Sequence, residues 1–174
     1  MTRIVNRPRT PGFKCCAFTG HRPGKLPYSL WDGNGQAEKL KERISSAVDG
    51  LIAEGFGHFV SGGALGIDTL AALIILEKRE KNPFLTLEIA VPFPEQDERW
   101  TERDKAVYRK ILSRADIVTT VSCAYNPHAL RLRNEFMLET CDALIAVFDG
   151  SHGGTYQTVS SAYDKGIRTI YIKP

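Results

Sequence analysis

One glycine turn in the chain joins an apolar strand to an apolar helix. Residues 59–72 read Phe-Val-Ser-Gly-Gly-Ala-Leu-Gly-Ile-Asp-Thr-Leu-Ala-Ala, with Ser61, Gly62, Gly63 and Ala64 at the break and Asp68 shortly after it. Glycine allows a sharp turn and a close approach by a ligand. A helix that begins at such a turn directs unpaired N–H groups and its positive dipole end at the turn. The pattern therefore indicates a phosphate or anion site, although a tight turn with nothing bound has the same sequence.

A second glycine turn lies near the C-terminus. It runs from Asp149 to Thr155 and contains Gly153 and Gly154, with Tyr156 next as a candidate for stacking on a base. Two such turns suit a ligand that carries phosphate, and the amides of Gly154 and Thr155 would then face it. We expect a Gly154→Val substitution to abolish binding while the domain still folds, with about 1–3 kcal/mol lost to backbone strain.

Other candidate residues follow two further apolar segments. They are Thr19, Gly20, His21 and Arg22 after the first predicted strand, and Pro92, Phe93 and Gln96 after the third. Ligands of open α/β sheets bind beyond the carboxyl ends of the strands, so we expect these residues to share one site with the glycine turns. Arg22 suits a phosphate through its planar guanidinium, with a plain surface arginine as the alternative. His21 has a similar alternative, which is capping of a backbone carbonyl.

Few acidic residues lie close to the glycine turns. Asp68 suits either a helix-capping role or acceptance of a ribose hydroxyl, because the first turn of a helix favours a carboxylate. The spacing of Arg131, Arg133 and Glu135 favours a solvated helical face. An N-glycosidase needs one group to stabilise an oxocarbenium-like centre and another to activate water. Asp68 and Glu135 are the acidic candidates for that catalytic work.

Strand and helix patterns alternate along the chain. The first strand ends at residues 19–20, the second runs into Ser61, and the others span 85–91, 116–121, 143–148 and 167–172. Helices are expected over 36–54, from the first glycine turn to about residue 80, and over 96–114, 128–140 and 154–165, with Gly55 and Gly57 ending the first. This alternation predicts an α/β fold with a mainly parallel sheet of about six strands between two helical layers.

Length and composition narrow the class of protein. The 174 residues suit a single domain over 14–174, preceded by a flexible N-terminal tail over 1–13. A net charge of +3 tolerates anions but gives weak support for nucleic acid binding. No apolar run reaches membrane-spanning length, and no secretory signal is evident, so we expect a cytoplasmic protein. The four cysteines form no CxxC pair, so no metal site is predicted.

These motifs resemble those of a known superfamily. Ser61-Gly-Gly-Ala-Leu-Gly-Ile-Asp68 is similar to a motif of the DNA-processing (Smf/DprA) proteins. The run Arg133-Asn-Glu-Phe-Met137, followed by Cys141-Asp142 and by Gly153-Gly-Thr155, resembles the layout of the LOG phosphoribohydrolases. With Thr19-Gly-His-Arg-Pro23, the chain is most similar to the YpsA-type branch (DUF1273) of the SLOG superfamily.

The resemblance implies a Rossmann-like three-layer sandwich that binds a nucleotide or nucleotide-derived ligand, adding Arg133 and Asn134 to the site. No firm cofactor follows from it. A ligand sensor, a sequestering protein or a regulator is the leading hypothesis; a nucleotide N-glycosidase and a single-stranded DNA binder are the alternatives. The phosphoribohydrolases carry a glutamate two residues after the threonine of their Gly-Gly-x-Gly-Thr motif. This chain has Gln157 at that place, with Thr158 next, so a carboxylate needed for hydrolysis is missing. A homodimer or higher homo-oligomer is the default expectation for such folds.

Overall fold

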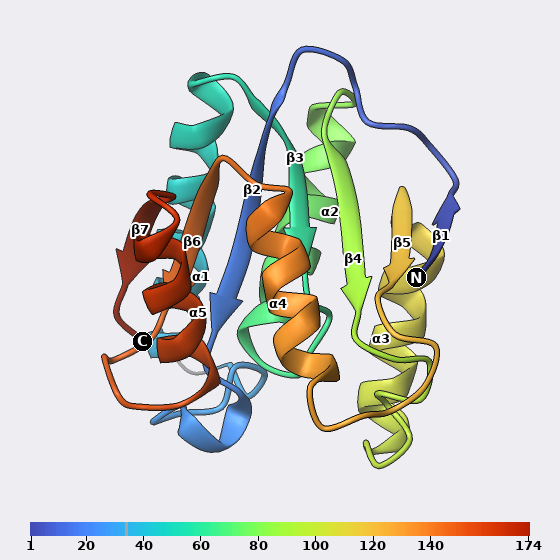
Figure 1. The fold of residues 1–174 in the computed structure, drawn as a ribbon. Helices are drawn as coiled ribbons and strands as arrows, with labels where there is room; N and C mark the ends of the chain where they lie inside the picture. The colour runs from blue at the N-terminus through green and yellow to red at the C-terminus, as the bar shows by residue number, and fades with distance from the viewer. Residues whose placement is uncertain (34) are drawn as a thin grey trace.

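The computed structural model describes residues 1–33 and 35–174, which form an α/β fold of three layers (Figure 1). Its strands are β1 (Thr2–Val5), β2 (Lys14–Gly20), β3 (Phe56–Ser61), β4 (Thr86–Val91), β5 (Ile117–Thr120), β6 (Ala143–Val147) and β7 (Arg168–Ile172). Its helices are the short 3-10 helix η1 (Pro23–Lys25), α1 (Gly35–Ala53), α2 (Ile67–Lys81), α3 (Glu102–Arg114), α4 (Ala129–Glu139) and α5 (Gly154–Asp164). The expected α/β sandwich with a mainly parallel sheet is confirmed. None of the helices described is long and apolar enough to cross a membrane.

The sheet reverses its direction of growth at β2. Its strand order is β1-β5-β4-β3-β2-β6-β7, and all neighbours pair in parallel except β1 with β5. From β2 the chain adds β3, β4 and β5 on one side, and it then crosses to add β6 and β7 on the other. The carboxyl ends of β2 and β6 therefore flank the switch point, where open α/β sheets bind their ligands.

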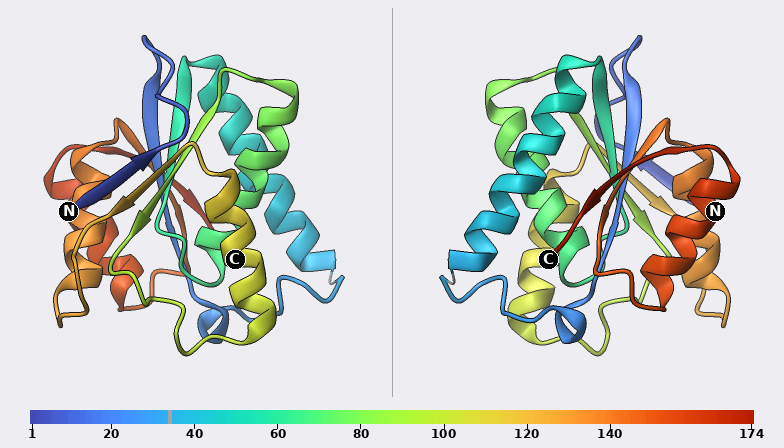
Figure 2. Two further views of the ribbon diagram at one scale, coloured as in Figure 1. Left: turned by 90° about the vertical axis from the view of Figure 1, so that its right-hand side faces the viewer. Right: turned by 90° about the vertical axis from the view of Figure 1, so that its left-hand side faces the viewer.

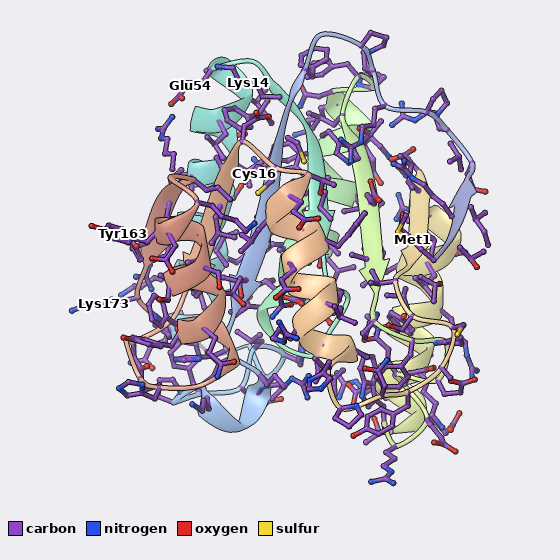
Figure 3. The ribbon with its side chains drawn as sticks, in the orientation of Figure 1. Met1, Lys14, Cys16, Glu54, Tyr163 and Lys173 are labelled. Atoms are coloured by element: carbon purple, nitrogen blue, oxygen red, sulfur yellow. The ribbon has the colours of Figure 1, made fainter. Side chains whose placement is uncertain are left out.

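Helices cover both faces of the sheet. In the side views, α1, α2 and α3 lie on one face and α4 and α5 on the other (Figure 2). Successive strand residues point to opposite faces. Accordingly, Phe18 joins the larger core beneath α1 and α2, while its neighbour Ala17 joins the smaller core beneath α4 and α5. Lys14 and Glu54 lie at the opposite end of the sheet from the carboxyl ends of β2 and β6 (Figure 3).

The N-terminal segment forms a strand that its sequence pattern does not predict. Residues 2–5 form β1, which pairs antiparallel with β5 and makes the sheet seven-stranded instead of six-stranded. Arg3 and Arg9 bind the buried carboxylate of Glu88 at 3.1 and 2.9 Å, and Arg7 binds Asp116 at 2.7 Å. The expectation of a flexible tail missed these contacts, because the buried carboxylates that hold the arginines lie far along the chain.

Two local boundaries differ from the sequence expectation. The helix predicted over 96–114 begins only at Glu102, because Thr101 caps it by accepting a hydrogen bond from the amide of Asp104. The turn before β3 rests on Gly55, with φ of +89°, whereas Gly57 lies inside β3.

Candidate functional site

A pocket of about 230 Å³ opens beyond the carboxyl ends of β2 and β6, at the switch point of the sheet. Its lining includes many of the residues predicted from the sequence: Thr19, Gly20, His21, Arg22, Ala64, Asp68, Arg133, Asn134, Gly153, Gly154 and Thr155. They come from the end of β2, the first glycine turn, α4 and the start of α5. The fold thus brings four separated motifs to one cavity, as parallel strands with a shared carboxyl edge require.

Two lining residues were missed from the sequence, Phe18 and Lys25, and a third, Ser151, was noted only as part of the second glycine turn. Lys25 lies in η1, and its ammonium donates to the backbone carbonyl of His152 at 2.7 Å. That bond joins the loop after β2 to the second glycine turn across 127 positions of sequence. A lysine three residues after Arg22, in the same loop, was the signal that would have predicted a second cation here.

Several predicted residues lie outside the pocket. Pro92, Phe93 and Gln96 follow β4, and β3 separates that strand from β2. The ring of Phe93 packs edge-on against Tyr125, and the amide of Gln96 donates to the hydroxyl of Tyr108 at 2.6 Å. The prediction of one site for all strand ends did not include strand order, which the sequence pattern does not reveal.

The first glycine turn is closed by its own hydrogen bonds. The amide of Gly63 donates to the Ser61 hydroxyl at 3.2 Å, the amide of Ala64 to the Asp68 carboxylate at 3.4 Å, and the amide of Ile67 to the carbonyl of His21 at 3.3 Å. The whole turn is buried except for a half-buried residue 65. These three amides therefore have protein acceptors, and Ser61, Gly62 and Gly63 lie behind the pocket wall.

The second glycine turn is open. Gly154 is exposed, and a Cβ built on it would meet no atom within 4 Å. Gly153 precedes α5 as its N-cap and offers no side-chain hydrogen bond, so the first amides of the helix lack intrahelical acceptors. The unusual backbone belongs to Gly153, with φ of +153°, and not to Gly154. The strain cost expected for Gly154→Val is therefore wrong.

A buried arginine forms part of the pocket wall. Arg133 is 5% exposed, and its Nη1 lies 3.6 Å from an Asp68 carboxylate oxygen. That distance is an ion pair but exceeds hydrogen-bonding range, and Nη1 has no hydrogen-bond partner within the described residues. Burial lowers the pKa of Arg133 and raises the pKa of Asp68, and their mutual attraction opposes both shifts. A buried guanidinium nitrogen without a hydrogen bond is energetically costly, and an anion would relieve that cost.

Side-chain hydrogen bonds connect Arg133 to the second glycine turn. Its Nε donates to the amide oxygen of Asn134 at 2.8 Å, and the Asn134 amide nitrogen donates to the Thr158 hydroxyl at 2.9 Å. That hydroxyl donates in turn to the carbonyl of Gly154 at 2.9 Å. The prediction that this helix face is solvated is wrong for Arg133, which is buried. Sequence spacing alone did not distinguish the buried Arg133 from the exposed Arg131.

His21 holds the loop that carries the second turn. It is 2% exposed, and its Nε2 lies 2.9 Å from the Asp149 carboxylate. Hydrogen bonds from Ser151, and then the contact with His21, hold the pKa of Asp149 well below its usual range. Asp149 therefore supports the pocket from outside its lining.

Glu135 and Tyr156 face a neighbouring groove between α4 and α5. Glu135 pairs with Arg131 at 2.7 Å, one helical turn away, and Tyr156 packs its ring on His152. Of the two catalytic candidates, the pocket contains only Asp68. Within residues 1–33 and 35–174, no group of three or more His, Cys, Asp or Glu side chains could hold a metal ion.

Comparisons with known proteins place the chain among bacterial relatives. A sequence profile of the YpsA family, described as the YspA SLOG family, matches residues 16–169. A UPF0398 protein of Bacillus pumilus is 31% identical over 144 residues, covering 82% of this chain and 77% of the relative. Another UPF0398 protein, from Bacillus cereus, is 33% identical over 156 residues, which cover 88% of this chain and 84% of that relative.

Two solved structures share the fold. DNA processing protein A of Helicobacter pylori, whose single-stranded DNA binding mode has been described, superposes with a TM-score of 0.61 at 17% identity. DNA processing protein A of Streptococcus pneumoniae superposes with a TM-score of 0.60 at 18% identity. Each match covers 91% of this chain, but the chain spans only 64% and 50% of those two proteins. At such identities the likeness shows the fold alone.

Proposed function

The chain belongs to the YspA SLOG family, and from that premise we propose that it binds a nucleotide or nucleotide-derived ligand through a phosphate group. The observation that carries the proposal is the charge of the switch-point pocket. Arg22, Lys25 and Arg133 line it against a single carboxylate, Asp68. An excess of cations beside the open end of a helix favours a multiply charged anion.

The pocket offers a distinct place for each part of such a ligand. The first amides of α5, at Gly154 and Thr155, are the proposed phosphate contacts, with Arg22 and Lys25 beside them in the lining. Asp68 lies deeper in the wall next to Arg133, where its carboxylate suits a ribose hydroxyl. We assign no base-stacking ring, since Phe93 and Tyr156 do not line the pocket.

A binding role, as sensor, sequestering protein or regulator, agrees better with these side chains than a hydrolytic one. Glu135 lines the neighbouring groove, and Gln157, which is followed by Thr158, occupies the place where the phosphoribohydrolases carry a glutamate. The Thr158 hydroxyl already donates to the carbonyl of Gly154. A pair of carboxylates at one ligand is therefore missing from the lining, which contains Asp68 alone.

Calorimetric titration of AMP, ADP-ribose and unphosphorylated adenosine tests the proposal. AMP is expected to bind at least about tenfold more tightly than adenosine, a difference of about 1.4 kcal/mol that the phosphate supplies. An Arg22→Ala variant is expected to lose that difference, whereas Arg43→Ala, on the remote helix α1, retains it. Equal affinity for AMP and adenosine, or no binding by any phosphorylated member of the set, would refute a phosphate site.

Cleavage of the ligand is the competing outcome of the same titrations. Free adenine released from AMP would indicate an N-glycosidase, and its loss in Asp68→Asn but not in Glu135→Gln would identify Asp68 as the catalytic carboxylate. Intact AMP recovered after prolonged incubation supports the binding role.

Single-stranded DNA binding is a second candidate, favoured by the fold shared with DNA processing protein A. Binding of this kind depends on neutralised phosphates, so its affinity falls steeply with salt. Fluorescence anisotropy of a labelled oligonucleotide at two salt concentrations measures this directly. A flat response, or no binding at low salt, rejects the candidate. Light scattering in the same buffers tests the expected homodimer.

A further inference from the structure

A second pocket, of about 260 Å³, lies on the helical face formed by α2 and α3. Its lining is largely apolar and includes Leu65, Leu73 and Val107, with the ring of Trp31 at its edge. Trp31 belongs to the long loop between η1 and α1, and 42% of its surface is exposed. An apolar cavity with an aromatic ring and a few polar groups in its lining has the composition of a small-molecule site.

The second pocket is separated from the first by backbone. Gly66 lines it, and a Cβ built on Gly66 would lie 2.6 Å from the carbonyl oxygen of His21, which belongs to the first pocket. No lining residue is shared between the two cavities. The second pocket is therefore a distinct site whose occupancy can be measured independently.

One cation at this pocket is available to a ligand. Arg103 lines the pocket at the start of α3, and neither a hydrogen bond nor an ion pair of its guanidinium occurs within the described part of the chain. Asp104 also lines the pocket, but its carboxylate accepts a hydrogen bond from the Thr101 hydroxyl at 2.7 Å in the helix cap. The Thr69 hydroxyl is likewise engaged, donating to the carbonyl of Ala64 at 2.9 Å.

We propose that this second pocket binds a small aromatic carboxylate. The ring occupies the apolar cavity against Trp31, Leu73 and Val107, and the carboxylate pairs with Arg103. An unpaired guanidinium favours a planar carboxylate because two parallel N–H donors match its two oxygens. The apolar lining selects the ring, and the single free cation selects the acid over a neutral analogue.

Calorimetric titration with naphthalene-2-carboxylate and naphthalene-2-carboxamide tests both parts of this proposal. The acid is expected to bind about tenfold more tightly than the amide, and Arg103→Ala is expected to remove that preference. Arg109→Ala is the matched control, since Arg109 is an exposed arginine on the same helix but does not line the pocket. Val107→Trp, which fills the cavity, is expected to abolish binding of both compounds.

The same titration in Gly154→Val locates the binding. Unchanged affinity for the acid there supports the second pocket, whatever the fate of the nucleotide proposal. If Gly154→Val no longer binds naphthalene-2-carboxylate, the acid binds in the first pocket and the inference is overturned. Equal affinity for acid and amide, binding that survives Val107→Trp, or no binding at millimolar concentration would overturn it as well.

Discussion

The two glycine turns look alike in the sequence but differ in the folded protein. The turn from Ser61 to Ile67 is buried apart from the half-buried Leu65, and the amides of Gly63, Ala64 and Ile67 have acceptors within the protein. The turn that ends at Gly154 is exposed and begins a helix whose N-cap provides no side-chain acceptor. Both precede helices that begin at the same edge of the sheet. The first turn therefore builds the wall of the site, while the second remains free to contact a ligand.

From this difference we infer that a glycine motif is available to a ligand only where its amides lack acceptors within the protein. In the first turn, three amides donate to acceptors within the protein, which are the Ser61 hydroxyl, the Asp68 carboxylate and the carbonyl of His21. The arginines differ in a related way. Glu88 accepts hydrogen bonds from Arg3 and from Nη2 of Arg9, although Nε of Arg9 has no partner within the described residues. Arg133 has no hydrogen bond to a carboxylate, and its buried Nη1 has no partner in the part of the chain that the structure describes.

The largest expected effect is a difference between the two turns in how much a side chain added at a glycine lowers the free energy of unfolding. Gly66→Ala introduces a Cβ at 2.6 Å from the His21 carbonyl oxygen, at a φ of +94° that L side chains rarely adopt. We expect it to lower the free energy of unfolding by about 3 kcal/mol or more. Gly154→Ala, with open space at its Cβ, is expected to be neutral or slightly stabilising. Urea denaturation measures both, and equal losses would show that the second turn is as closed as the first.

The next effect tests whether the arginines bound to Glu88 contribute to stability. Burial alone would raise the pKa of Glu88, but hydrogen bonds from His58, Thr119 and Arg9 and the charge of Arg3 outweigh it and lower that pKa to about 2. A carboxylate whose pKa is lowered on folding stabilises the protein above its ordinary pKa and loses that contribution as the pH falls towards 2.

We expect this loss to amount to about 3 kcal/mol between about pH 5 and pH 2, because one pKa unit corresponds to about 1.4 kcal/mol. Glu88→Gln is expected to flatten this part of the stability curve measured by urea denaturation. Glu54→Gln, which removes an exposed pair with Arg168, leaves it in place. An unchanged acid limb in Glu88→Gln would show that the arginine cluster adds no net stability.

How much of this was predictable from the sequence depends on the range of the interactions involved. The alternation of apolar segments was enough for the α/β sheet and for the motifs at its carboxyl edge, because both follow from local periodicity. Strand order is a long-range property, so Phe93 and Gln96 were expected in one pocket with both turns, but neither lines it; the Gln96 amide lies beside Gly63 of the first turn instead. The burial of Arg133 beside Asp68 also depends on a partner distant in sequence. The same is true of β1, whose Arg3 binds Glu88.

A third effect concerns the open turn alone. Gly154→Val is expected to lower the affinity for AMP by at least about tenfold, because a branched side chain would occupy the space in front of the helix amides. Its unfolding free energy is expected to change little, since nothing lies within 4 Å of the new Cβ. Gly50→Ala, a helical glycine of α1 with equally open surroundings, is the matched control for titration calorimetry. Retained affinity in Gly154→Val would remove the open turn from the site.

The smallest effect tests the connection between the two turns. Thr158→Val removes the hydroxyl that accepts from Asn134 and donates to the carbonyl of Gly154. A buried hydrogen bond of this kind contributes about 1 kcal/mol, so we expect a loss of stability of that size and a several-fold weaker affinity for AMP. Thr158→Ser retains the hydroxyl and is expected to recover most of the affinity. If Val and Ser variants bind equally, the hydrogen bonds through Thr158 do not position the open turn.

The most direct test of the different roles of the two turns is an amide NMR titration of the ¹⁵N-labelled protein with pyrophosphate and then with AMP. The amides of Gly154 and Thr155 are expected to shift progressively and to saturate, because they face the phosphate. Those of Gly63 and Ala64, already bonded to Ser61 and Asp68, are expected to change little. Saturable shifts confined to Gly63 and Ala64, or no shifts at either turn, would contradict the account.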